Sequence, residues 1–130
     1  MRHKQTLVWT ITSALVFLHC TYACAAEGYA SYYTVKSCQR EGTSGVWTAS
    51  GSRYDENALT CAMRRRDWGS KFLVYGKKTG RSVVCELRDF GPGKGPTRKG
   101  VVIDLTPRAF KVVCGSLSLG KCEVSVQEIR

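Results

Sequence analysis

Residues 100–115 read GVVIDLTPRAFKVVCG, and this stretch joins a short apolar strand to the start and stop signals of a helix. Residues 100–105 form a compact apolar run, which is typical of a buried strand. Thr106 can cap a helix, Pro107 suits its first turn, and Gly115 can end it. The predicted helix has an apolar face made of Ala109, Phe110, Val112 and Val113. We therefore expect a strand followed at once by one short helix.

The rest of the chain also predicts short strands. They are expected over residues 29–35, 71–75, 81–88 and 122–129, which are rich in aromatic and β-branched residues or alternate with polar ones. The turn at residues 77–80, KKTG, indicates a hairpin. About six short strands with one short helix predict an all-β fold, a small closed barrel rather than a sandwich. Glycine-rich loops are expected at residues 41–51 and 91–96, where binding groups usually project.

The N-terminus has the layout of a secretory signal peptide. Arg2 and Lys4 precede the mostly apolar residues 7–18, and small residues follow at Ala23, Ala25 and Ala26. Cleavage after Ala26 would leave a single domain over residues 27–130, secreted, periplasmic or extracellular. An uncleaved anchor helix is a weaker alternative, because the apolar run falls short of the roughly 20 residues that span a membrane. Lipidation at Cys20 or Cys24 is another, although the residues before them suit that processing poorly.

The chain is basic, with 20 Lys and Arg against 10 Asp and Glu. Arg2 and Lys4 are the only charged residues of the predicted signal peptide, so residues 27–130 have a net charge of +8. Such a balance favours polyanionic surroundings such as anionic wall polymers, membrane surfaces or nucleic acid, although a solvated positive surface explains it as well. Export argues against nucleic acid as a partner. The densest positive cluster is residues 64–66, three consecutive arginines.

Five cysteines remain after cleavage: Cys38, Cys61, Cys85, Cys114 and Cys122. No Cys-x-x-Cys pair accompanies them, and both histidines lie in the predicted signal peptide, so we predict no metal site. In an oxidising compartment disulfides are the expected use. Two bridges among five cysteines can be drawn in 15 ways. We favour Cys114–Cys122, because these two flank a Gly/Ser-rich turn, and one of the other cysteines is left over.

Two aspartates are the candidate catalytic residues. Asp104 lies inside the apolar strand, where an ionisable side chain is costly unless it is paired or used. Partial desolvation would raise its pKa and suit it to act as a general acid. Capping of the helix is the alternative role, but Thr106 is better placed for it. Asp89 precedes the second glycine-rich loop, where it could bind its own backbone in a turn or divide acid and charge-stabilising roles with Asp104.

Seven short motifs in order resemble the RlpA-like domains of bacteria. They are residues 30–33 (ASYY), 48–51 (TASG), 54–55 (YD), 58–60 (ALT), 80–84 (GRSVV), 88–92 (RDFGP) and 102–106 (VIDLT). The last motif and its helix also resemble the barrel half of expansins. The resemblance implies a six-stranded double-psi β-barrel with one or two short helices and an open groove for a glycan. In RlpA-like enzymes the groove takes peptidoglycan and the reaction is a lytic transglycosylation, which needs no cofactor. In expansins the same barrel loosens wall polymers without hydrolysis.

The resemblance also implies substrate-binding residues, for which we take Tyr32, Tyr33, Thr48, Tyr54 and Arg88. Trp47 and Trp68 are further candidates for stacking on sugar rings, with core packing as the ordinary alternative for each aromatic residue.

One departure from the family bears on activity. RlpA-like enzymes commonly carry a histidine that assists catalysis where this chain has Met63, and a thioether cannot carry a proton. The sequence leaves open a monomeric enzyme, a non-catalytic glycan-binding or wall-loosening module, and an inhibitor or elicitor built on the same barrel.

Overall fold

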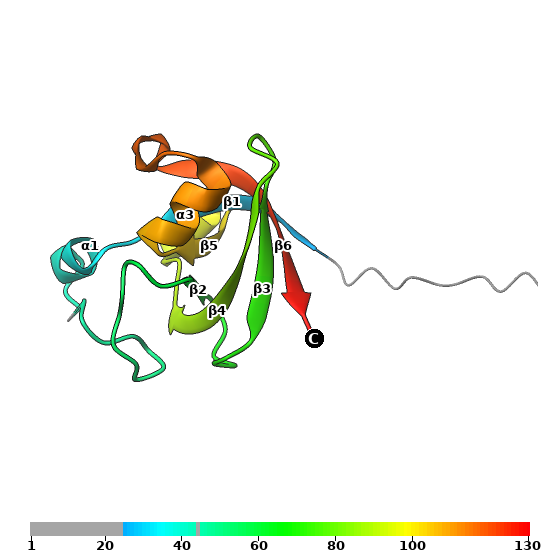
Figure 1. Cartoon of the computed structure of the whole chain (residues 1–130). Helices are drawn as coiled ribbons and strands as arrows, with labels where there is room; N and C mark the ends of the chain where they lie inside the picture. Colours follow the sequence, from blue (N-terminus) through cyan, green and yellow to red (C-terminus); the bar gives the residue numbers. More distant parts are fainter. Residues whose placement is uncertain (1–24, 44) are drawn as a thin grey trace, which may run out of the picture.

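The computed structural model describes residues 25–43 and 45–130, which form a closed barrel of six strands (Figure 1). Around the barrel the strands follow the order β1-β5-β2-β4-β3-β6. Their bounds are β1 (Ala26–Tyr32), β2 (Thr60–Met63), β3 (Lys71–Gly76), β4 (Ser82–Phe90), β5 (Val101–Leu105) and β6 (Lys121–Ile129). The predicted all-β barrel of six short strands is confirmed.

Two of the neighbouring strand pairs are parallel. β1 runs parallel to β5, and β2 runs parallel to β4. The other neighbours are antiparallel. This mixture separates the fold from an up-and-down barrel, in which every neighbour is antiparallel. Each parallel pair needs a long crossover connection, and these connections bring distant segments to one rim.

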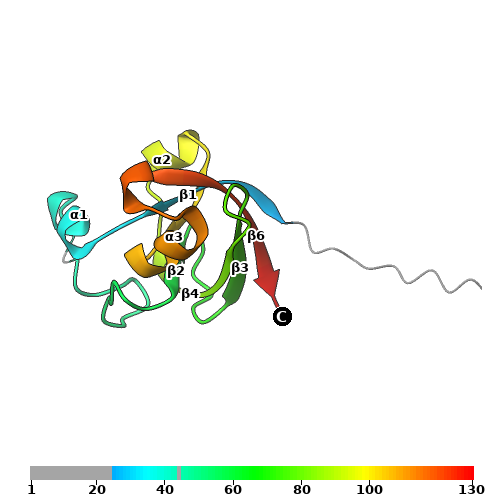
Figure 2. The same cartoon turned by 45° about the horizontal axis from the view of Figure 1, so that its top comes forward.

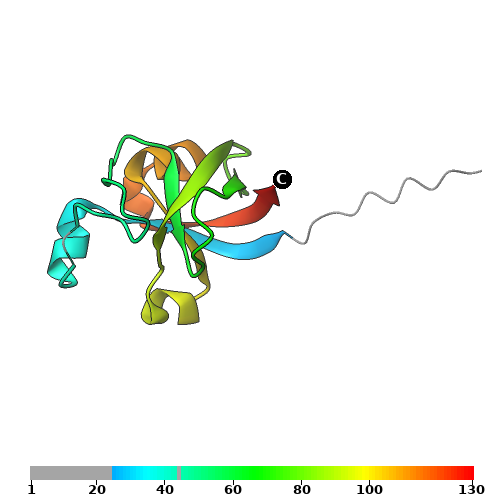
Figure 3. The same cartoon turned by 90° about the horizontal axis from the view of Figure 1, so that it is seen from below.

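The helices lie at the ends and sides of the barrel. They are α1 (Val35–Arg40), α2 (Lys94–Arg98), α3 (Pro107–Cys114) and the single 3₁₀ turn η1 (Leu117–Leu119). In Figure 1, α1 and the segments of residues 41–43 and 45–59, cyan to green, lie to one side of the strands. Figures 2 and 3 show α2 standing out from the barrel between β4 and β5.

The predicted helix is confirmed, including its cap. Thr106 precedes α3, and its Oγ1 accepts a hydrogen bond from the Ala109 backbone at 3.3 Å. The same hydroxyl donates to the Ala58 carbonyl at 2.6 Å, which joins the helix start to the segment before β2. Gly115 ends the helix with φ 93, a left-handed conformation that favours glycine.

The core fills the barrel interior and is closed at one end by α3. Its largest fully buried side chains include Phe72, Leu87, Ile103, Leu105 and Phe110. β5 alternates buried and partly buried residues, so Val101, Ile103 and Leu105 face the core. Alternation turns Asp104 to the opposite face. α3 contacts β1, β3, β4, β5 and β6, and its apolar face completes the core.

Three local expectations differ from the structure. The strand expected over residues 29–35 ends at Tyr32, because Thr34 and Ser37 form a reciprocal capping box that starts α1. β2 was not among the predicted strands, since its four residues carry little pattern. Within the loop expected at residues 91–96, Lys94–Arg98 forms α2, with Pro96 tolerated in the first turn of the helix.

The predicted Cys114–Cys122 disulfide is confirmed and ties the end of α3 to the start of β6. The predicted signal peptide falls almost wholly on residues 1–24, which lie outside the described part of the chain. Ala26, the residue before the expected cleavage point, is the first residue of β1. Among the described residues, no helix has the length and apolar character needed to cross a membrane.

Candidate functional site

A cavity of about 350 Å³ lies between the segment that follows α1 and the ends of β4 and β5. Both predicted catalytic aspartates line it, as do three of the five predicted substrate-binding residues. Its lining comprises Tyr33, Cys38, Glu41, Thr43, Gly45, Trp47, Thr48, Ala49, Tyr54, Ala62, Asp89, Phe90, Gly91, Gly93 and Asp104.

Three neighbouring strands place the two aspartates on the same face. Asp104 of β5 pairs with Ala62 of β2, and Ala62 pairs with Asp89 of β4. Residues directly opposite in neighbouring strands point the same way, so both carboxylates project where Ala62 does. Two strand spacings put their backbones roughly 10 Å apart. The small side chain of Ala62 leaves the space between them open.

Asp104 is partly buried and has one hydrogen-bond donor among the described residues. Ser31, its partner in register on β1, donates from Oγ to Oδ1. Burial raises the Asp104 pKa to about 6, the Ser31 bond opposes this rise, and the negative charges of Glu41 and Asp89 add to it. Gly91 faces the other oxygen, and a Cβ there would lie 3.3 Å from Oδ2. The missing side chain of Gly91 therefore keeps this edge of the carboxyl group open.

Asp89 makes the local turn contact that its position suggested, and it also lines the cavity. Its Oδ1 accepts hydrogen bonds from the backbone N–H of Ala49 and of Phe90, each at 2.9 Å. The Phe90 bond is the local turn contact, and the Ala49 bond holds residues 47–53 against the end of β4. Asp89 nevertheless lines the cavity, so it also contributes negative charge there.

Tyr33 and Tyr54 form a stacked pair in the cavity wall. Their ring centroids are 4.6 Å apart with an interplanar angle of 22°, and the Tyr54 hydroxyl donates to the Tyr33 carbonyl at 2.6 Å. The Tyr33 hydroxyl is buried and has no hydrogen-bond partner among the described residues. Burial, followed by the negative charge of Asp89, raises its pKa above the ordinary value, so this group remains a neutral donor.

The other predicted binding residues differ in their positions. Thr48 lines the cavity, but its hydroxyl is engaged in its own turn, donating to the Ser52 carbonyl at 3.0 Å. Arg88 lies outside the cavity, in an ion pair with Glu86 at 2.6 Å, and lines a separate hollow of about 240 Å³. Tyr32 points to the core, with its ring 4.9 Å from that of Phe110. The structure does not bring Tyr32 or Arg88 to the aspartates.

Of Trp47, Trp68 and Met63, one lines the cavity and two pack against the core. Trp47 is 62% exposed and lines the cavity, whereas Trp68 packs against the core. Met63 is partly buried against the core and is not among the residues that line the cavity. The neighbouring residue, Ala62, is the one that faces the aspartates.

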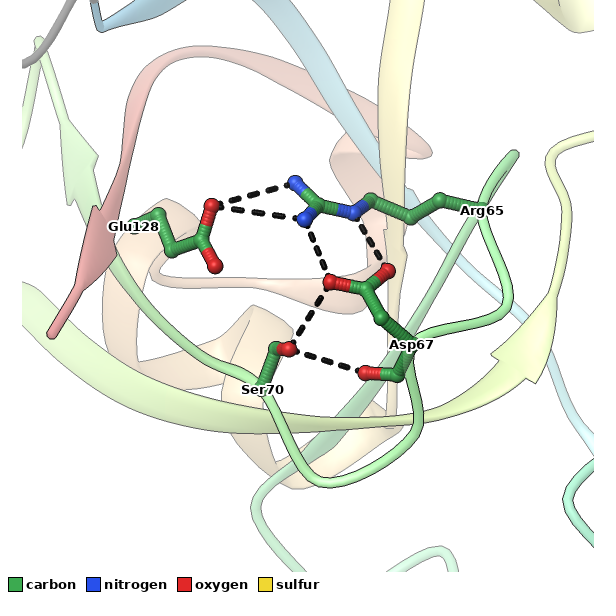
Figure 4. A network of polar contacts seen from close by, with 4 residues as sticks. All are labelled: Arg65, Asp67, Ser70 and Glu128. Atoms are coloured by element: carbon green, nitrogen blue, oxygen red, sulfur yellow. Dashed lines mark hydrogen bonds and ion pairs between the residues drawn. The ribbon is translucent and has the colours of Figure 1, made fainter.

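The three consecutive arginines do not form one uniform patch. Arg65 donates to Asp67 from Nε and Nη2 and also binds Glu128 at 3.3 Å, while Ser70 supports Asp67 (Figure 4). The guanidinium groups of Arg64 and Arg66 instead lie over the Phe90 ring, 5.2 Å and 4.6 Å from its centroid. Because Phe90 lines the cavity, these two positive charges stand at its edge.

Several cavity residues were not foreseen from the sequence. Glu41 and Cys38 line the cavity from α1 and the turn that follows it. Ser31 lay within a recognised motif, but nothing in the sequence alone indicated that it would bind Asp104. Only the parallel register of β1 and β5 brings them together.

The closed barrel with two parallel strand pairs and the paired carboxylates at its rim define a double-psi β-barrel protein of the RlpA-like type. The chain belongs to the lytic transglycolase family, whose model matches residues 25–126. The resemblance inferred from the sequence motifs is confirmed.

Curated relatives are similar over most of this chain. A probable endolytic peptidoglycan transglycosylase RlpA of Nostoc is 34% identical over 101 residues, which cover 78% of this chain and 25% of the relative. The RlpA of Rickettsia felis, named an endolytic peptidoglycan transglycosylase, is 30% identical over 73% of this chain and 39% of its own length. The chain thus spans about a quarter to two fifths of these relatives.

Solved structures share the fold at low sequence identity. The Streptomyces papain inhibitor superposes with a TM-score of 0.61 at 20% identity, covering 85% of this chain and 98% of its own. A Clavibacter michiganensis expansin in complex with cellohexaose gives 0.58 at 18% identity, covering 82% of this chain and 51% of its own. At these identities the likeness concerns the barrel alone.

Proposed function

We propose that this barrel binds a peptidoglycan strand in the cavity and cuts it by lytic transglycosylation, with Asp104 as general acid and then general base. The observation that carries the proposal is the position of Asp104, partly buried at the cavity with a pKa near 6 and one open edge. Membership in the lytic transglycolase family supports the same chemistry. A carboxyl group with this pKa holds a proton near neutral pH more readily than an ordinary aspartate.

The reaction needs one group that gives and then takes a proton. Protonated Asp104 donates to the glycosidic oxygen as the bond to the anomeric carbon breaks, and the leaving sugar departs with its hydroxyl. The resulting carboxylate accepts the proton of the sugar's own hydroxyl, whose oxygen attacks the anomeric carbon and closes an anhydro ring. Atoms and charges balance, and Asp104 ends protonated. No water is consumed, so no second residue has to activate one.

Neighbouring groups assist this cycle. Asp89 and Glu41 add negative charge, which favours the positive charge that develops on the sugar ring in the transition state. The stacked rings of Tyr33 and Tyr54 form part of the wall against which the glycan would lie. Trp47 and the face of Phe90 supply apolar surface for sugar rings.

The proposed reaction depends less on residue 63 than the sequence suggested. Its side chain packs against the core, and the cycle described above uses a single proton carrier. Residue 63 is therefore not required to be titratable in this account.

The decisive comparison uses isolated cell-wall sacculi and the purified protein. Wild type is expected to release anhydro-ended fragments, and Asp104→Asn is expected to reduce the rate by 10²-fold or more. Asp67→Asn is the matched control, because Asp67 is bound to Arg65 away from the cavity, and it should retain most activity. Equal rates for wild type and Asp104→Asn would contradict the proposed role.

A non-catalytic glycan-binding or wall-loosening module is the alternative, favoured by the replacement of the family's histidine with Met63. It predicts co-sedimentation with insoluble glycan and no bond cleavage at any pH. Trp47→Ala removes an exposed aromatic ring from the cavity wall and should weaken binding under either account. Binding without release of fragments would favour the module.

The site of action and the further partners follow from the charge and the N-terminal sequence. We propose that the protein is exported as a monomer and acts in the envelope or outside the cell. Arg64 and Arg66, exposed at the cavity edge and without an ion pair among the described residues, would contact anionic wall polymers. Arg66→Ala should weaken binding to an anionic polymer at low salt more than Lys111→Ala on α3 does. Equal losses of binding in the two variants would show that the polymer responds only to the overall positive charge and not to the arginines at the cavity edge.

A further inference from the structure

We propose that Cys61 and Cys85 form a second disulfide, which joins the neighbouring strands β2 and β4 on their inward face. Both side chains are fully buried, and their Sγ atoms lie 2.6 Å apart. This inference is independent of the glycan activity proposed above. It assigns a covalent cross-link to two residues whose thiols would otherwise meet inside an apolar core.

The register of β2 and β4 places the two cysteines next to each other. Cys61 pairs with Leu87 in the parallel ladder of β2 and β4, and Cys85 lies two residues before Leu87. Residues two apart in a strand face the same way, so Cys85 shares the inward face of Leu87. Cys61, Cys85 and Leu87 all belong to the buried core cluster. The two cysteines therefore meet with no change of strand pairing.

The chemistry requires oxidation before the barrel closes. The contact with Cys85 and burial raise the pKa of the Cys61 thiol, so the folded barrel disfavours the thiolate that attacks a disulfide. In the open chain one thiolate attacks a protein dithiol oxidant in its disulfide form, and the second cysteine then displaces it. Two thiols lose two protons and two electrons, one S–S bond forms, and the oxidant leaves as a dithiol.

The cross-link would fix the strands that carry the candidate site. Ala62, next to Cys61, faces the cavity, and Asp89, the last residue but one of β4, lies on the same face. With Cys114–Cys122 already bonded, Cys38 would remain as the single thiol of the described residues. The odd number of cysteines is then explained by a free thiol at the cavity.

Peptide mapping of the full chain, produced with export to an oxidising compartment, tests this directly. After alkylation without reduction, trypsin releases residues 54–64 with Cys61 and residues 82–88 with Cys85. We expect these two peptides to be linked, as a pair lighter by two hydrogens. The linked peptides 112–121 and 122–130 report Cys114–Cys122 in the same digest. Separate alkylation of the Cys61 and Cys85 peptides while the control pair is linked would overturn the proposal, and so would a link of either to Cys38.

A stability measurement gives a second and independent reading. Reduction should lower the urea midpoint of wild type more than that of a Cys61→Ala/Cys85→Ala variant, which retains only Cys114–Cys122. Cys38→Ala serves as the control and should respond to reduction as wild type does. Equal shifts in wild type and the double variant would show that Cys61 and Cys85 are thiols.

Discussion

At the scale of single residues, the candidate site depends on the burial and the hydrogen bond of one carboxyl group, that of Asp104. Asp104 keeps one oxygen bound to Ser31 and the other beside Gly91, at the open edge of the cavity. Its raised pKa comes first from burial, and the acidic residues of the same cavity add to it. These features have measurable consequences that do not require a structure of a complex.

The pH dependence of cleavage should follow the protonation of Asp104. Its pKa of about 6 means that the protonated acid declines as the pH rises through this value. We expect the rate of fragment release at saturating substrate to fall on the alkaline side of about pH 6, by roughly tenfold for each unit well above it. Initial rates on sacculi between pH 4 and 9 measure this fall in rate. A rate that stays level up to pH 8 would show that another group donates the proton.

The free energy of unfolding should also depend on the protonation of Asp104, and it should fall as the pH rises. Folding raises the Asp104 pKa from 3.8 to about 6, so the folded barrel holds this proton more tightly than the unfolded chain does. The resulting stabilisation is complete below about pH 4 and is lost as the pH rises through 6, a change of roughly 2–3 kcal/mol.

Asp104→Asn removes this titration and supplies the comparison. Urea unfolding at pH 4 and pH 8 should show the free energy of unfolding of the variant gaining on that of wild type by about that amount. A difference between the two proteins that does not change with pH would contradict the raised pKa.

Gly91 should matter for activity more than for stability. A Cβ at this position would lie 3.3 Å from Asp104 Oδ2 and 3.6 Å from the Ala62 Cβ, so Gly91→Ala crowds the open edge of the acid. We expect at least a tenfold loss of cleavage rate. Gly95→Ala, whose Cβ would meet nothing within 4 Å, is the matched control and should be nearly neutral. Equal rates in the two variants would show that this edge is not used.

At the scale of elements, the strand–helix unit around β5 and α3 was predictable because its signals are local. A cap, a first-turn proline and a closing glycine stand at the right spacing in residues 106–115. β2 was not predicted, because its four residues owe their conformation to β4 and β5 on either side. α1 escaped prediction because it has no buried residue and therefore no apolar face to mark it, although it begins at a side-chain cap.

The start of α3 carries a stability prediction. Thr106 is fully buried, and its hydroxyl both accepts from Ala109 and donates to Ala58. Thr106→Ala should lower the free energy of unfolding by about 1–3 kcal/mol, since it removes a cap and takes the hydroxyl donor from the partly buried Ala58 carbonyl. Urea denaturation at neutral pH measures the loss. Thr97→Ala on the exposed α2 is the control, and an equal effect of the two would contradict this role of the cap.

At the scale of the whole molecule, the barrel topology assembles the cavity from segments far apart in the chain. The sequence could predict Asp104 from its polarity within an apolar strand, and the motif order indicated the barrel. It could not predict that Tyr32 faces the core while Tyr33 lines the cavity, because that depends on where β1 ends and α1 begins. Nor could it place Arg88 in an ion pair with Glu86.

The central claim is that the glycan is cut without the use of water. Digestion of sacculi in heavy-oxygen water, followed by mass analysis of the released ends, tests it most directly. We predict anhydro ends that carry no label, released by wild type and not by Asp104→Asn. Labelled reducing ends would identify a hydrolase, and the absence of any released fragment would identify a binding module. Either result would contradict the proposed reaction.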